Sequence, residues 1–408
     1  MKVLHLSATD YGLGASRAAQ RLHDALNIFS EFQSYMRVGE RRSNDPNIFG
    51  PQTRFDRSLY KASLYIDLMV SKFIKDGNPI HHSLSFVPTG IHNQINKFPC
   101  DIVHLHWVNR NLITVEEIAL IKKPLIWTFH DSWAFCGAEH HPFASDLRFV
   151  TGYNQPCGKK FLGMIDLNQS CWQRKRDAWS RIKFQVVAPS EWMADQASKS
   201  FLMSKSIINT IPNTLDTNIY SPIPVDLARK LLNLPLGKKL VLFAGIGGKK
   251  NPHKGWNLFY DAIGHSNLVD IDFNIVVLGS EFRGISNIHS KSCYELDYFW
   301  DDISLACIYS AVDIVVVTSS IESFCQTASE AQSCGTPVVA FNATGVKDIV
   351  INDVTGYLVD SFSVELLSFY IRKVLEDSQL TTKLQIQSRF HAAAAVRKSL
   401  TKSQWCPQ

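Results

Sequence analysis

Short apolar runs alternate with segments of helical spacing through the first half of the chain. The runs are continuous rather than alternately apolar and polar, which is typical of strands buried on both faces. Ser190 follows one such run, and a serine before a helical pattern is a typical N-cap, so a helix is predicted from Glu191. This alternation indicates a parallel sheet covered by helices on both faces. The predicted strands are 3–6, 102–105, 125–129 and 184–188, and a helix is predicted over 15–26.

A second series of the same kind follows, which predicts two doubly wound α/β domains. We expect Ser206–Ile211 to be the first strand of this series. The resulting domains are residues 1–200 and 201–379, and the Ala-rich helix at about 380–399 is expected to pack back on the first domain. Residues 137–168 lack periodicity and indicate a long irregular insertion. Further strands are predicted over 240–245, 273–279, 312–317 and 337–341, with a helix over 256–263.

Composition narrows the class of protein. Charged residues make up 19% of the 408 residues, below the roughly 25% of an average soluble protein, which argues against disorder. The net charge of +5 is too small and too spread out to indicate nucleic-acid binding. No apolar stretch reaches the ~18 residues that a membrane-spanning helix needs, and the first residues resemble a buried strand more than a signal peptide. The nine cysteines form no CxxC pair, so we expect reduced thiols and a cytoplasmic protein.

Open α/β sheets bind ligands at the carboxyl ends of their strands, and one such end carries two glutamates. Glu322 follows the predicted strand that ends near Val317, and Glu330 lies eight residues later inside a predicted helix. The start of that helix offers free N–H groups to a phosphate, and flanking carboxylates can accept hydrogen bonds from sugar hydroxyls. Two glutamates at this spacing alone would be ordinary surface residues. Here they lie in a loop and a helix that follow a buried strand, and Gly335 and Pro337 end the helix. This combination favours a binding site.

The segment from Glu322 through Pro337 resembles the E-x7-E signature of family 4 glycosyltransferases. The resemblance implies the GT-B fold: two Rossmann-like domains that face each other across a cleft. It also implies transfer of a sugar from a nucleotide diphosphate donor with retention of anomeric configuration. Glu322 would then bind hydroxyls of the donor sugar and Glu330 the ribose, with the amides of Ser323, Phe324 and Cys325 near the donor. Cys325 stands where the family usually has glycine, the residue that allows the closest backbone approach or a positive φ.

A basic loop after the strand over 240–245 is similar to the family's diphosphate-binding segment. Lys254 matches its Lys-Gly position, and Lys249 matches an upstream position that usually holds arginine, with Lys250 as an alternative. Two fixed cations here would stabilise the negative charge that grows on the leaving diphosphate. The alternative interpretation is a solvated basic turn.

The first strand-to-helix turn, Asp10–Ser16, is partly glycine-rich, which alone is a weak signal. The resemblance implies that Gly14 brings backbone amides near the diphosphate or the acceptor. A tight turn explains Gly12 equally well.

A histidine ends the strand predicted over 125–129. In the family a histidine at this point approaches the donor sugar, and that role is carried to His130. His104 and His106 also lie at a strand end, but as core residues they need no function. This segment, with Trp172–Arg176 and Asp216, looks most like the branch that builds bacterial surface polysaccharides such as colanic acid and O-antigen.

A zinc site is an alternative use of several cysteines and histidines, but no two cysteines are closely spaced, so we expect no metal. Asp270 and Asp272 precede a predicted strand and therefore lie at the wrong end of the sheet for chemistry. No cofactor is expected besides the nucleotide sugar, because lysines can neutralise the diphosphate. The residues of the zinc alternative are Cys136, His140, His141, Cys157 and Cys171.

The stretch Trp172–Lys183 is basic and rich in tryptophan. An ordinary amphipathic helix is the favoured interpretation. The alternative is contact with anionic lipid headgroups, because acceptors in such pathways are often lipid-linked.

Together these patterns predict a retaining glycosyltransferase of bacterial surface polysaccharide, including lipopolysaccharide, biosynthesis. His130, Lys249, Lys254 and Glu322 would take part in catalysis, and no side-chain general base is assigned. The expected partners are a nucleotide sugar and a glycan or lipid-linked acceptor, with no nucleic acid, in the cytoplasm or at the inner face of the membrane. A catalytically inactive sugar-nucleotide-binding protein and a GT-B epimerase or phosphorylase remain as alternatives.

Overall fold

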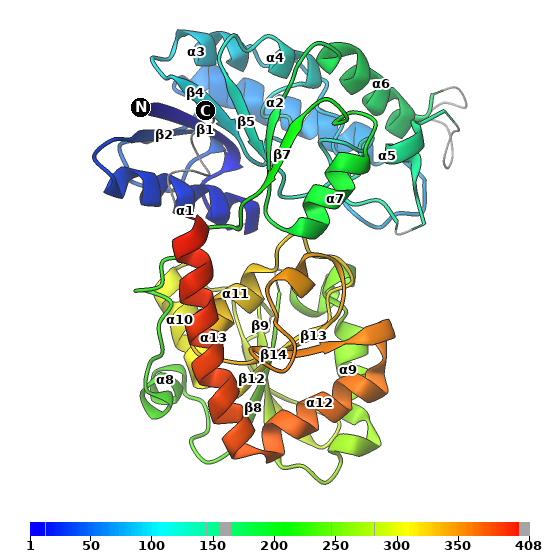
Figure 1. Cartoon of the computed structure of the whole chain (residues 1–408). Helices are drawn as coiled ribbons and strands as arrows, with labels where there is room; N and C mark the ends of the chain where they lie inside the picture. Colours follow the sequence, from blue (N-terminus) through cyan, green and yellow to red (C-terminus); the bar gives the residue numbers. More distant parts are fainter. Residues whose placement is uncertain (13, 144, 155–164, 246, 281, 400–408) are drawn as a thin grey trace. The chain divides into compact units, whose positions relative to one another are not determined.

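The structure is a computed structural model that describes residues 1–12, 14–143, 145–154, 165–245, 247–280 and 282–399, without the side chains of 361 and 393–399. The chain divides into two compact units, Met1–Ile211 and Pro212–Gln408 (Figure 1). Each unit is described by itself.

The first unit is built on a seven-stranded sheet in which every pairing is parallel. The strand order is β3-β2-β1-β4-β5-β6-β7, so the chain moves outward from β1 in one direction and then returns to build the other side. Figure 1 shows helices on both faces of this sheet. The strands are β1 (Lys2–Thr9), β2 (Gln33–Glu40), β3 (Ile48–Phe49), β4 (Ile102–Leu105), β5 (Leu125–Thr128), β6 (Gln185–Ala188) and β7 (Ile207–Thr210).

Side chains satisfy free N–H groups at the starts of α2, α4, α6 and α7 in the first unit. Ser190 accepts a hydrogen bond from the amide of Met193 and so caps α7, as the sequence predicts. Thr53 and Asp56 form a reciprocal capping box at the start of α2. The helices are α1 (Gly14–Ile28), α2 (Arg54–Ser71), α3 (Ile91–Lys97), α4 (Val115–Ala119), α5 (Arg148–Thr151), α6 (Leu167–Trp179) and α7 (Glu191–Lys199).

The strand predicted over Ser206–Ile211 belongs to the first sheet, so its assignment to the second series is wrong. β7 pairs in parallel with β6, with Ile208 opposite Val186, and ends the first sheet as an edge strand. Its residues alternate between exposed and half-buried, which fits an edge. The boundary between the two units falls after it, at Ile211 and Pro212, rather than at residue 200.

The second unit has a seven-stranded sheet of order β10-β11-β9-β8-β12-β13-β14. All pairings are parallel except β10 with β11, a hairpin that the sequence analysis missed. In β12, Val315 lies opposite Leu242 of β8 and Val338 of β13. The strands are β8 (Lys239–Ala244), β9 (Phe273–Leu278), β10 (Gly284–Ile288), β11 (Lys291–Leu296), β12 (Ile314–Val317), β13 (Val338–Phe341) and β14 (Gly356–Val359).

Two apolar cores cover the two faces of this sheet. Successive residues of β8 alternate between them: Leu242 packs into the core with α10 and α11, and Val241 and Phe243 pack into the core with α9 and α12. Burial on both faces explains why the predicted strands are continuously apolar. The helices are α8 (Val225–Leu232), α9 (Trp256–Gly264), α10 (Asp302–Ala311), α11 (Gln326–Ser333), α12 (Val364–Glu376) and α13 (Ser378–Ser399), with short 3₁₀ turns η1 (Gly248–Lys250), η2 (Pro252–Lys254), η3 (Ser266–Leu268), η4 (Thr344–Asp348) and η5 (Asp360–Phe362).

The strand order reverses between β1 and β4 in the first sheet and between β8 and β12 in the second. Loops that leave the carboxyl ends of such neighbours diverge and leave room for a ligand. Gly14 and His106 follow the first pair of strands, and Lys254 and Glu322 follow the second pair. The fold therefore places candidate residues at both points of reversal.

Three further expectations concern the cysteines, membrane-spanning helices and the packing of the last helix. The seven described cysteines are free thiols, as predicted, whereas Cys157 and Cys406 lie outside the described residues. Among the described residues, no helix is both long and apolar enough to cross a bilayer. The last helix, α13, packs on α11 and α12 of the second unit.

Candidate functional site

A lysine and a glutamate meet at the reversal point of the second sheet. The Nζ atom of Lys254 lies 2.5 Å from Oε1 of Glu322, and both side chains are largely buried. Lys254 ends the loop after β8, and Glu322 lies in the loop after β12, so adjacent parallel strands bring together residues that are 68 positions apart. The structure thus brings together the two residues that the sequence motifs single out separately.

Backbone contacts hold these two loops in place. The Thr318 hydroxyl donates to the Lys254 carbonyl at 2.8 Å, and the Ser320 amide donates to the His253 carbonyl at 2.9 Å. Gly255 has a φ of +67°, and a Cβ there would lie 2.1 Å from the Thr318 carbonyl oxygen. Only glycine fits at this close approach, which explains the Lys-Gly pair.

The surroundings of Lys254 keep its ammonium charged. Burial alone lowers the pKa of Lys254, but the Glu322 carboxylate outweighs that effect, and the pKa is raised from its usual value. The stem of the side chain crosses Gly245, where a Cβ would come within 2.8 Å of its Cγ. The loop therefore presents a fixed positive charge.

Lys249, the second predicted cation, binds a different carboxylate. Its Nζ lies 2.8 Å from Oε1 of Glu295 and 4.8 Å from the centre of the Trp256 ring. Ser280 and Ser286 donate to the same carboxylate at 2.6 and 2.7 Å. Burial raises the pKa of Glu295, but Lys249 and the two hydroxyls outweigh it and lower the pKa. Lys249 and Lys254 lie in the same loop after β8, but Lys249 is held by Glu295 and Lys254 by Glu322.

Cys325 adopts the backbone conformation that glycine would take. It precedes α11 with a φ of +77°, in the left-handed region, and its side chain is buried. The replacement of the usual glycine has therefore kept the glycine-like turn. Burial raises the pKa of its thiol, and the charges of Glu322, Lys254 and Glu330 act on it, which places all four in one neighbourhood. Phe324 beside it is buried, and Ser323 is half-buried, with its carbonyl against Gly345.

Glu330 lies inside α11 and is almost fully buried. Its Oε2 accepts a hydrogen bond from the Tyr309 hydroxyl of α10 at 2.8 Å. This bond fixes the orientation of the carboxylate from the side of the core.

His130 of the first unit lies at the end of a chain of buried histidines. Its Nε2 is 3.0 Å from Nδ1 of His106, whose Nε2 is 2.9 Å from Nδ1 of His5. Burial lowers the pKa of His130 to about 4 and those of the other two well below their usual value. The rings are therefore neutral at physiological pH, and each can donate at one nitrogen and accept at the other.

A carboxylate beside this chain forms a second buried network. Asp131 accepts from the Trp107 indole at 2.7 Å and lies 2.5 Å from Nδ1 of His140, whose Nε2 contacts the Ser83 hydroxyl at 2.9 Å. Burial raises the pKa of Asp131, but His140 outweighs it and holds that pKa below its usual range. The connectivity is that of a Ser-His-Asp triad, yet Ser83 has no exposed surface, so the network is structural.

Gly14 is the first residue of α1 and is exposed, which leaves the helix start accessible to a ligand. The Thr9 and Ser16 hydroxyls lie 2.7 Å apart and tie β1 to α1 across this turn. Residue 13, between them, lies outside the described residues.

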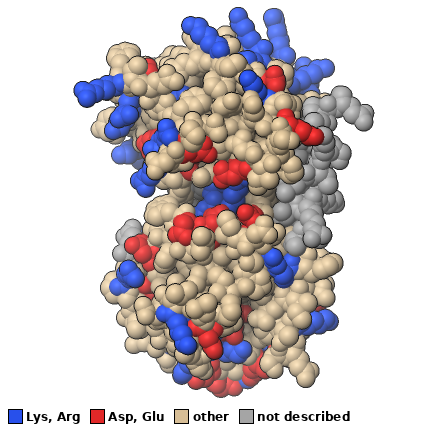
Figure 2. Space-filling view, turned by 90° about the vertical axis from the view of Figure 1, so that its left-hand side faces the viewer, with Lys and Arg blue, Asp and Glu red and all other residues tan. Residues whose placement is uncertain are grey.

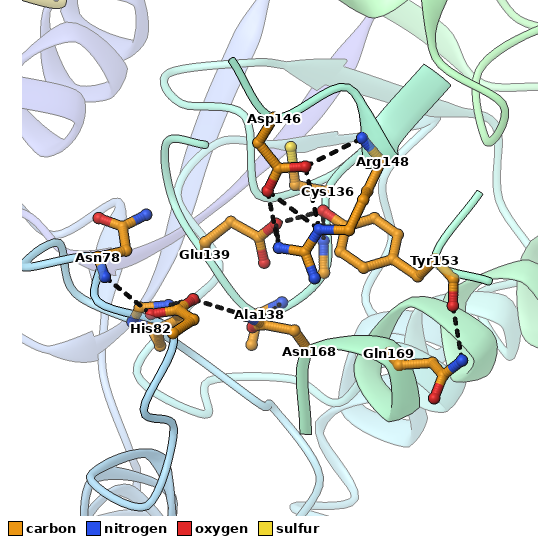
Figure 3. Close-up of polar contacts among 12 residues, drawn as sticks. Asn78, His82, Cys136, Ala138, Glu139, Asp146, Arg148, Tyr153, Asn168 and Gln169 are labelled. Atoms are coloured by element: carbon orange, nitrogen blue, oxygen red, sulfur yellow. Dashed lines mark hydrogen bonds and ion pairs between the residues drawn. The ribbon is translucent and has the colours of Figure 1, made fainter. Parts of the chain in front are cut away.

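The residues of the zinc alternative are used elsewhere. Figure 3 shows Cys136 beside a polar network in which the Tyr153 hydroxyl donates to Glu139, and Arg148 binds Asp146 at 2.7 Å. This network orders the described part of the insertion, and Cys157 lies outside the described residues. In the part of the chain that the structure describes, the residues close enough to share one ion are His5, His104 and His106, and His23, Asp24 and Asp45.

Contacts and burial also bear on two other segments from the sequence analysis, the pair Asp270 and Asp272 and the stretch Trp172–Lys183. Asp270 pairs with Arg372 and Asp272 with Lys238, at the amino end of the sheet as predicted. In the stretch Trp172–Lys183 both tryptophans and Lys175 are buried, and Arg174 binds Glu116 at 2.7 Å. Lys175 donates to three backbone carbonyls of residues 133, 136 and 137. The stretch is a core-packed helix, and its tryptophans do not face a lipid surface.

The sequence analysis missed three residues that support the site. Glu295 of β11 contacts Lys249, Tyr309 of α10 contacts Glu330, and His5 of β1 contacts His106, which in turn contacts His130. His5 is a polar residue inside the otherwise apolar run of residues 3–6, a signal that could have identified it. Glu295 lies in β11, whose sequence KSCYEL holds several polar residues, so it does not stand out. Tyr309 has no such signal.

Two family models match the chain. "Glycosyl transferases group 1" matches residues 225–390, and "Glycosyltransferase Family 4" matches residues 41–219. Each lies almost entirely in one of the two units, and together they account for most of the chain.

Curated relatives are similar over part of their length. A D-inositol 3-phosphate glycosyltransferase of Xylanimonas cellulosilytica is 32% identical over 43% of this chain and 44% of its own. A lipopolysaccharide 1,2-N-acetylglucosaminetransferase of Salmonella typhimurium is 23% identical over 48% of this chain and 54% of its own. The chain thus spans about half the length of these relatives.

A solved structure extends the similarity of fold to nearly the whole chain. The HepE protein of Anabaena, in complex with UDP-glucose, aligns with a TM-score of 0.63 over 98% of both chains at 16% identity. The GT-B fold that the sequence predicts is thereby confirmed. Residues 41–219 are thus similar to the Glycosyltransferase Family 4 model and residues 225–390 to the glycosyl transferases group 1 model, each over less than half of the chain.

Proposed function

We propose that this chain is a glycosyltransferase that moves a sugar from a nucleotide diphosphate sugar to an acceptor hydroxyl. The observation that carries the proposal is the Lys254–Glu322 pair at the reversal point of the second sheet. A cation next to a carboxylate matches the two ends of an activated sugar, because one binds phosphate oxygens and the other accepts hydroxyl hydrogens.

The chemical step needs a stabiliser for the leaving group. An ammonium carries three N–H donors, of which Glu322 takes one, so Lys254 can bind Glu322 and a phosphate oxygen together. As the bond between the sugar and the diphosphate breaks, negative charge grows on the phosphate oxygens, and a preorganised cation lowers the energy of that state. Lys249 adds a second positive charge from its anchor on Glu295.

The finer assignments follow the resemblance and belong to the proposal. Transfer proceeds with retention of configuration and without a side-chain general base. Glu330, oriented by Tyr309, binds the ribose, and His130 binds the donor sugar. The amides around Ser323, Phe324 and Cys325 and those at Gly14 are assigned to the donor.

The biological role is also part of the proposal. We assign the chain to bacterial surface polysaccharide biosynthesis, with a glycan or lipid-linked acceptor at the inner face of the membrane. Support comes from the Salmonella relative, whose name places it in lipopolysaccharide synthesis. The donor nucleotide is open among UDP, GDP and ADP.

A donor panel tests the proposal. Purified protein is heated with UDP-, GDP- and ADP-sugars, and one donor should raise the melting temperature by mass action. That donor is then incubated with glycan acceptors, and product is followed by mass spectrometry and by NMR of the new anomeric carbon. A transferred sugar with the donor's configuration is expected.

Other outcomes separate the alternatives. Donor binding without product from any acceptor would favour an inactive sugar-nucleotide-binding protein. An isomeric nucleotide sugar formed without acceptor would favour an epimerase, and a sugar phosphate formed with inorganic phosphate would favour a phosphorylase. A product with inverted configuration at the anomeric carbon would contradict the retaining mechanism but not the proposed sugar transfer.

A further inference from the structure

An arginine is buried inside the first unit with few of its N–H donors in use. Arg37 of β2 is 6% exposed, and its one hydrogen bond to a described residue runs from Nη1 to the carbonyl of the next residue, Val38. Its buried Nε–H has no partner in the described part of the chain. Burial lowers the pKa of Arg37 to about 10, so the guanidinium is still charged at neutral pH. Figure 2 shows other basic side chains of this unit projecting into solvent, which makes a buried cation here unusual.

A second buried arginine shows how such a charge is normally paired. Arg229 of α8 is 5% exposed, and it donates to the Asp313 carboxylate at 2.8 Å and to the backbone carbonyls of residues 235, 236, 238 and 311. Taking a charge out of water is costly unless its hydrogen bonds are made inside the protein. Arg37 is buried to the same extent without these partners, which indicates a role in binding rather than in stability.

A buried tyrosine near Arg37 also has an unpartnered polar group. Tyr60 of α2 is 6% exposed, and its hydroxyl makes no hydrogen bond to any described residue. Buried tyrosine hydroxyls usually find a partner. Gly39 leaves room for this one, because a Cβ at Gly39 would lie 2.4 Å from the hydroxyl oxygen. Burial raises the pKa of Tyr60, so the hydroxyl keeps its proton and can donate it to an acceptor.

Arg37 and Tyr60 line one pocket between β2, α2 and α3. The pocket is also lined by the half-buried Asp56 and by the exposed Leu59 and Gln94, so it opens to the surface above a buried polar floor. Its volume is about 30 Å³, which is room for one small polar or charged group but not for a sugar ring. A ligand would therefore insert a single group here and keep its remainder outside.

The pocket adjoins the carboxyl ends of two strands of the first sheet. Gly39 and Glu40 end β2, and Glu40 accepts a hydrogen bond at 3.0 Å from the hydroxyl of Tyr11, which lies in the turn after β1. The charge of Glu40 also acts on Tyr60. Because open α/β sheets bind ligands at the carboxyl ends of their strands, the remainder of a ligand anchored in this pocket can lie over β1 and β2.

We propose that the pocket of Arg37 and Tyr60 binds a small oxyanion group, a carboxylate or a phosphate, that is carried by a sugar. The Nε–H of Arg37 and the hydroxyl of Tyr60 donate to its oxygens, and the guanidinium balances its charge. The identification of this sugar as the acceptor rests on the proposed function, and it makes the acceptor an acidic or phosphorylated glycan rather than a neutral one.

Nitrogen NMR of the full chain tests binding at Arg37 directly. The Nε–H signal of Arg37, identified by its loss in Arg37→Lys, should shift saturably with glucuronate or with glucose 1-phosphate. The probe that acts distinguishes a carboxylate from a phosphate, and glucose at equal ionic strength should leave the signal in place. A signal that neither anion shifts, or that glucose shifts equally, would overturn the proposal. An equal response to acetate or inorganic phosphate would indicate an adventitious ion only and would overturn it as well.

Two variants separate binding from folding. Tyr60→Phe removes only an unpartnered hydroxyl, and Arg37→Met removes a poorly paired buried charge, so neither should lower the melting temperature of the free protein. Each should weaken binding of the active probe by about tenfold or more in calorimetry, the range for hydrogen bonds to a charged group.

The matched control is Arg229→Met, which breaks a fully paired buried arginine. It should lower the melting temperature and leave the affinity for the probe unchanged. An equal fall in the melting temperature of Arg37→Met would assign Arg37 to the fold and overturn the proposal, as would unchanged affinity in Tyr60→Phe.

The assignment of the ligand to the acceptor has its own test. In transfer assays Tyr60→Phe should raise the KM for an acidic or phosphorylated acceptor by about tenfold. An unchanged KM would overturn that assignment. The binding measurements involve no sugar transfer, so their failure leaves the proposed function untouched.

Discussion

The two sheets of this protein reverse their strand order in the same manner but bring different chemistry to that point. In the second unit the loops carry ion pairs, Lys254 with Glu322 and Lys249 with Glu295. In the first unit β4 is followed by His106, a neutral histidine that bonds to His5 inside β1 and to His130 after β5. Charge suits phosphates, and neutral rings offer directed hydrogen bonds to hydroxyl groups. Topology thus fixes where a site lies, and the residue types decide what it binds.

The largest effect should come from removing the charge at the second reversal point. Lys254→Ala deletes the cation that we propose faces the growing negative charge, so turnover should fall by about 100- to 1000-fold, the range for losing one preorganised stabilising group. Initial rates with the donor identified by thermal shift measure this effect.

The matched control is Lys238→Ala, which breaks an ion pair with Asp272 at the opposite end of the same sheet. It should retain nearly full activity. Equal losses in the two variants would show that charge at the reversal point has no special role.

Acid should destabilise the first unit before the second. Burial lowers the pKa of His130 to about 4 and that of His104 to about 3. A histidine in the unfolded chain binds a proton near pH 6.5, while the buried ring does not, so the folded state loses stability as pH falls from about 6.5 toward 4. The loss is about 1.4 kcal/mol per pH unit for each such histidine. Hydrogen exchange at pH 7 and pH 5, corrected for intrinsic rates, should show deprotection of β1, β4 and β5.

The second unit provides the internal comparison. The lowered pKa of Glu295 stabilises the fold above its usual value of 4.5 and is lost only below that, outside this window. Burial lowers the pKa of His253, so one histidine contributes acid sensitivity there. Simultaneous deprotection of both sheets at pH 5 would contradict the prediction.

The sequence was informative where a function depends on the end of a local element, and not where it depends on distant packing. Lys254 and Glu322 could be placed because each follows an apolar strand and precedes a helix. Ile207–Thr210 was recognised as a strand but assigned to the wrong sheet, because its alternating pattern does not specify its pairing partner. Glu295 and Tyr309 could not be matched to Lys249 and Glu330, since those contacts join elements across 46 and 21 residues without a motif.

Anchoring of Lys249 should matter less than Lys254 itself. Lys249→Ala removes the more distant cation, and we expect about a tenfold loss of kcat/KM, equivalent to about 1.4 kcal/mol. Glu295→Gln keeps the size of the side chain but releases the ammonium, so it should give a smaller loss. If Lys249→Ala lost as much kcat/KM as Lys254→Ala, the two cations would act as a unit, and Lys249 would not have the smaller role predicted here.

The smallest effect tests the turn before α11. Because Cys325 has a φ of +77°, any residue with a Cβ is strained there, and glycine is not. Cys325→Ala and Cys325→Gly both remove the buried thiol, so comparing these two variants isolates the backbone. The glycine variant should be the more stable by about 1 kcal/mol. At a position with negative φ the order would be reversed, because alanine restricts the unfolded chain more than glycine does. Urea unfolding of both variants measures the difference. An alanine variant as stable as the glycine variant would mean that the turn relaxes out of the left-handed region, and the amides of Ser323, Phe324 and Cys325 would then lose the fixed geometry on which their assignment to the donor depends.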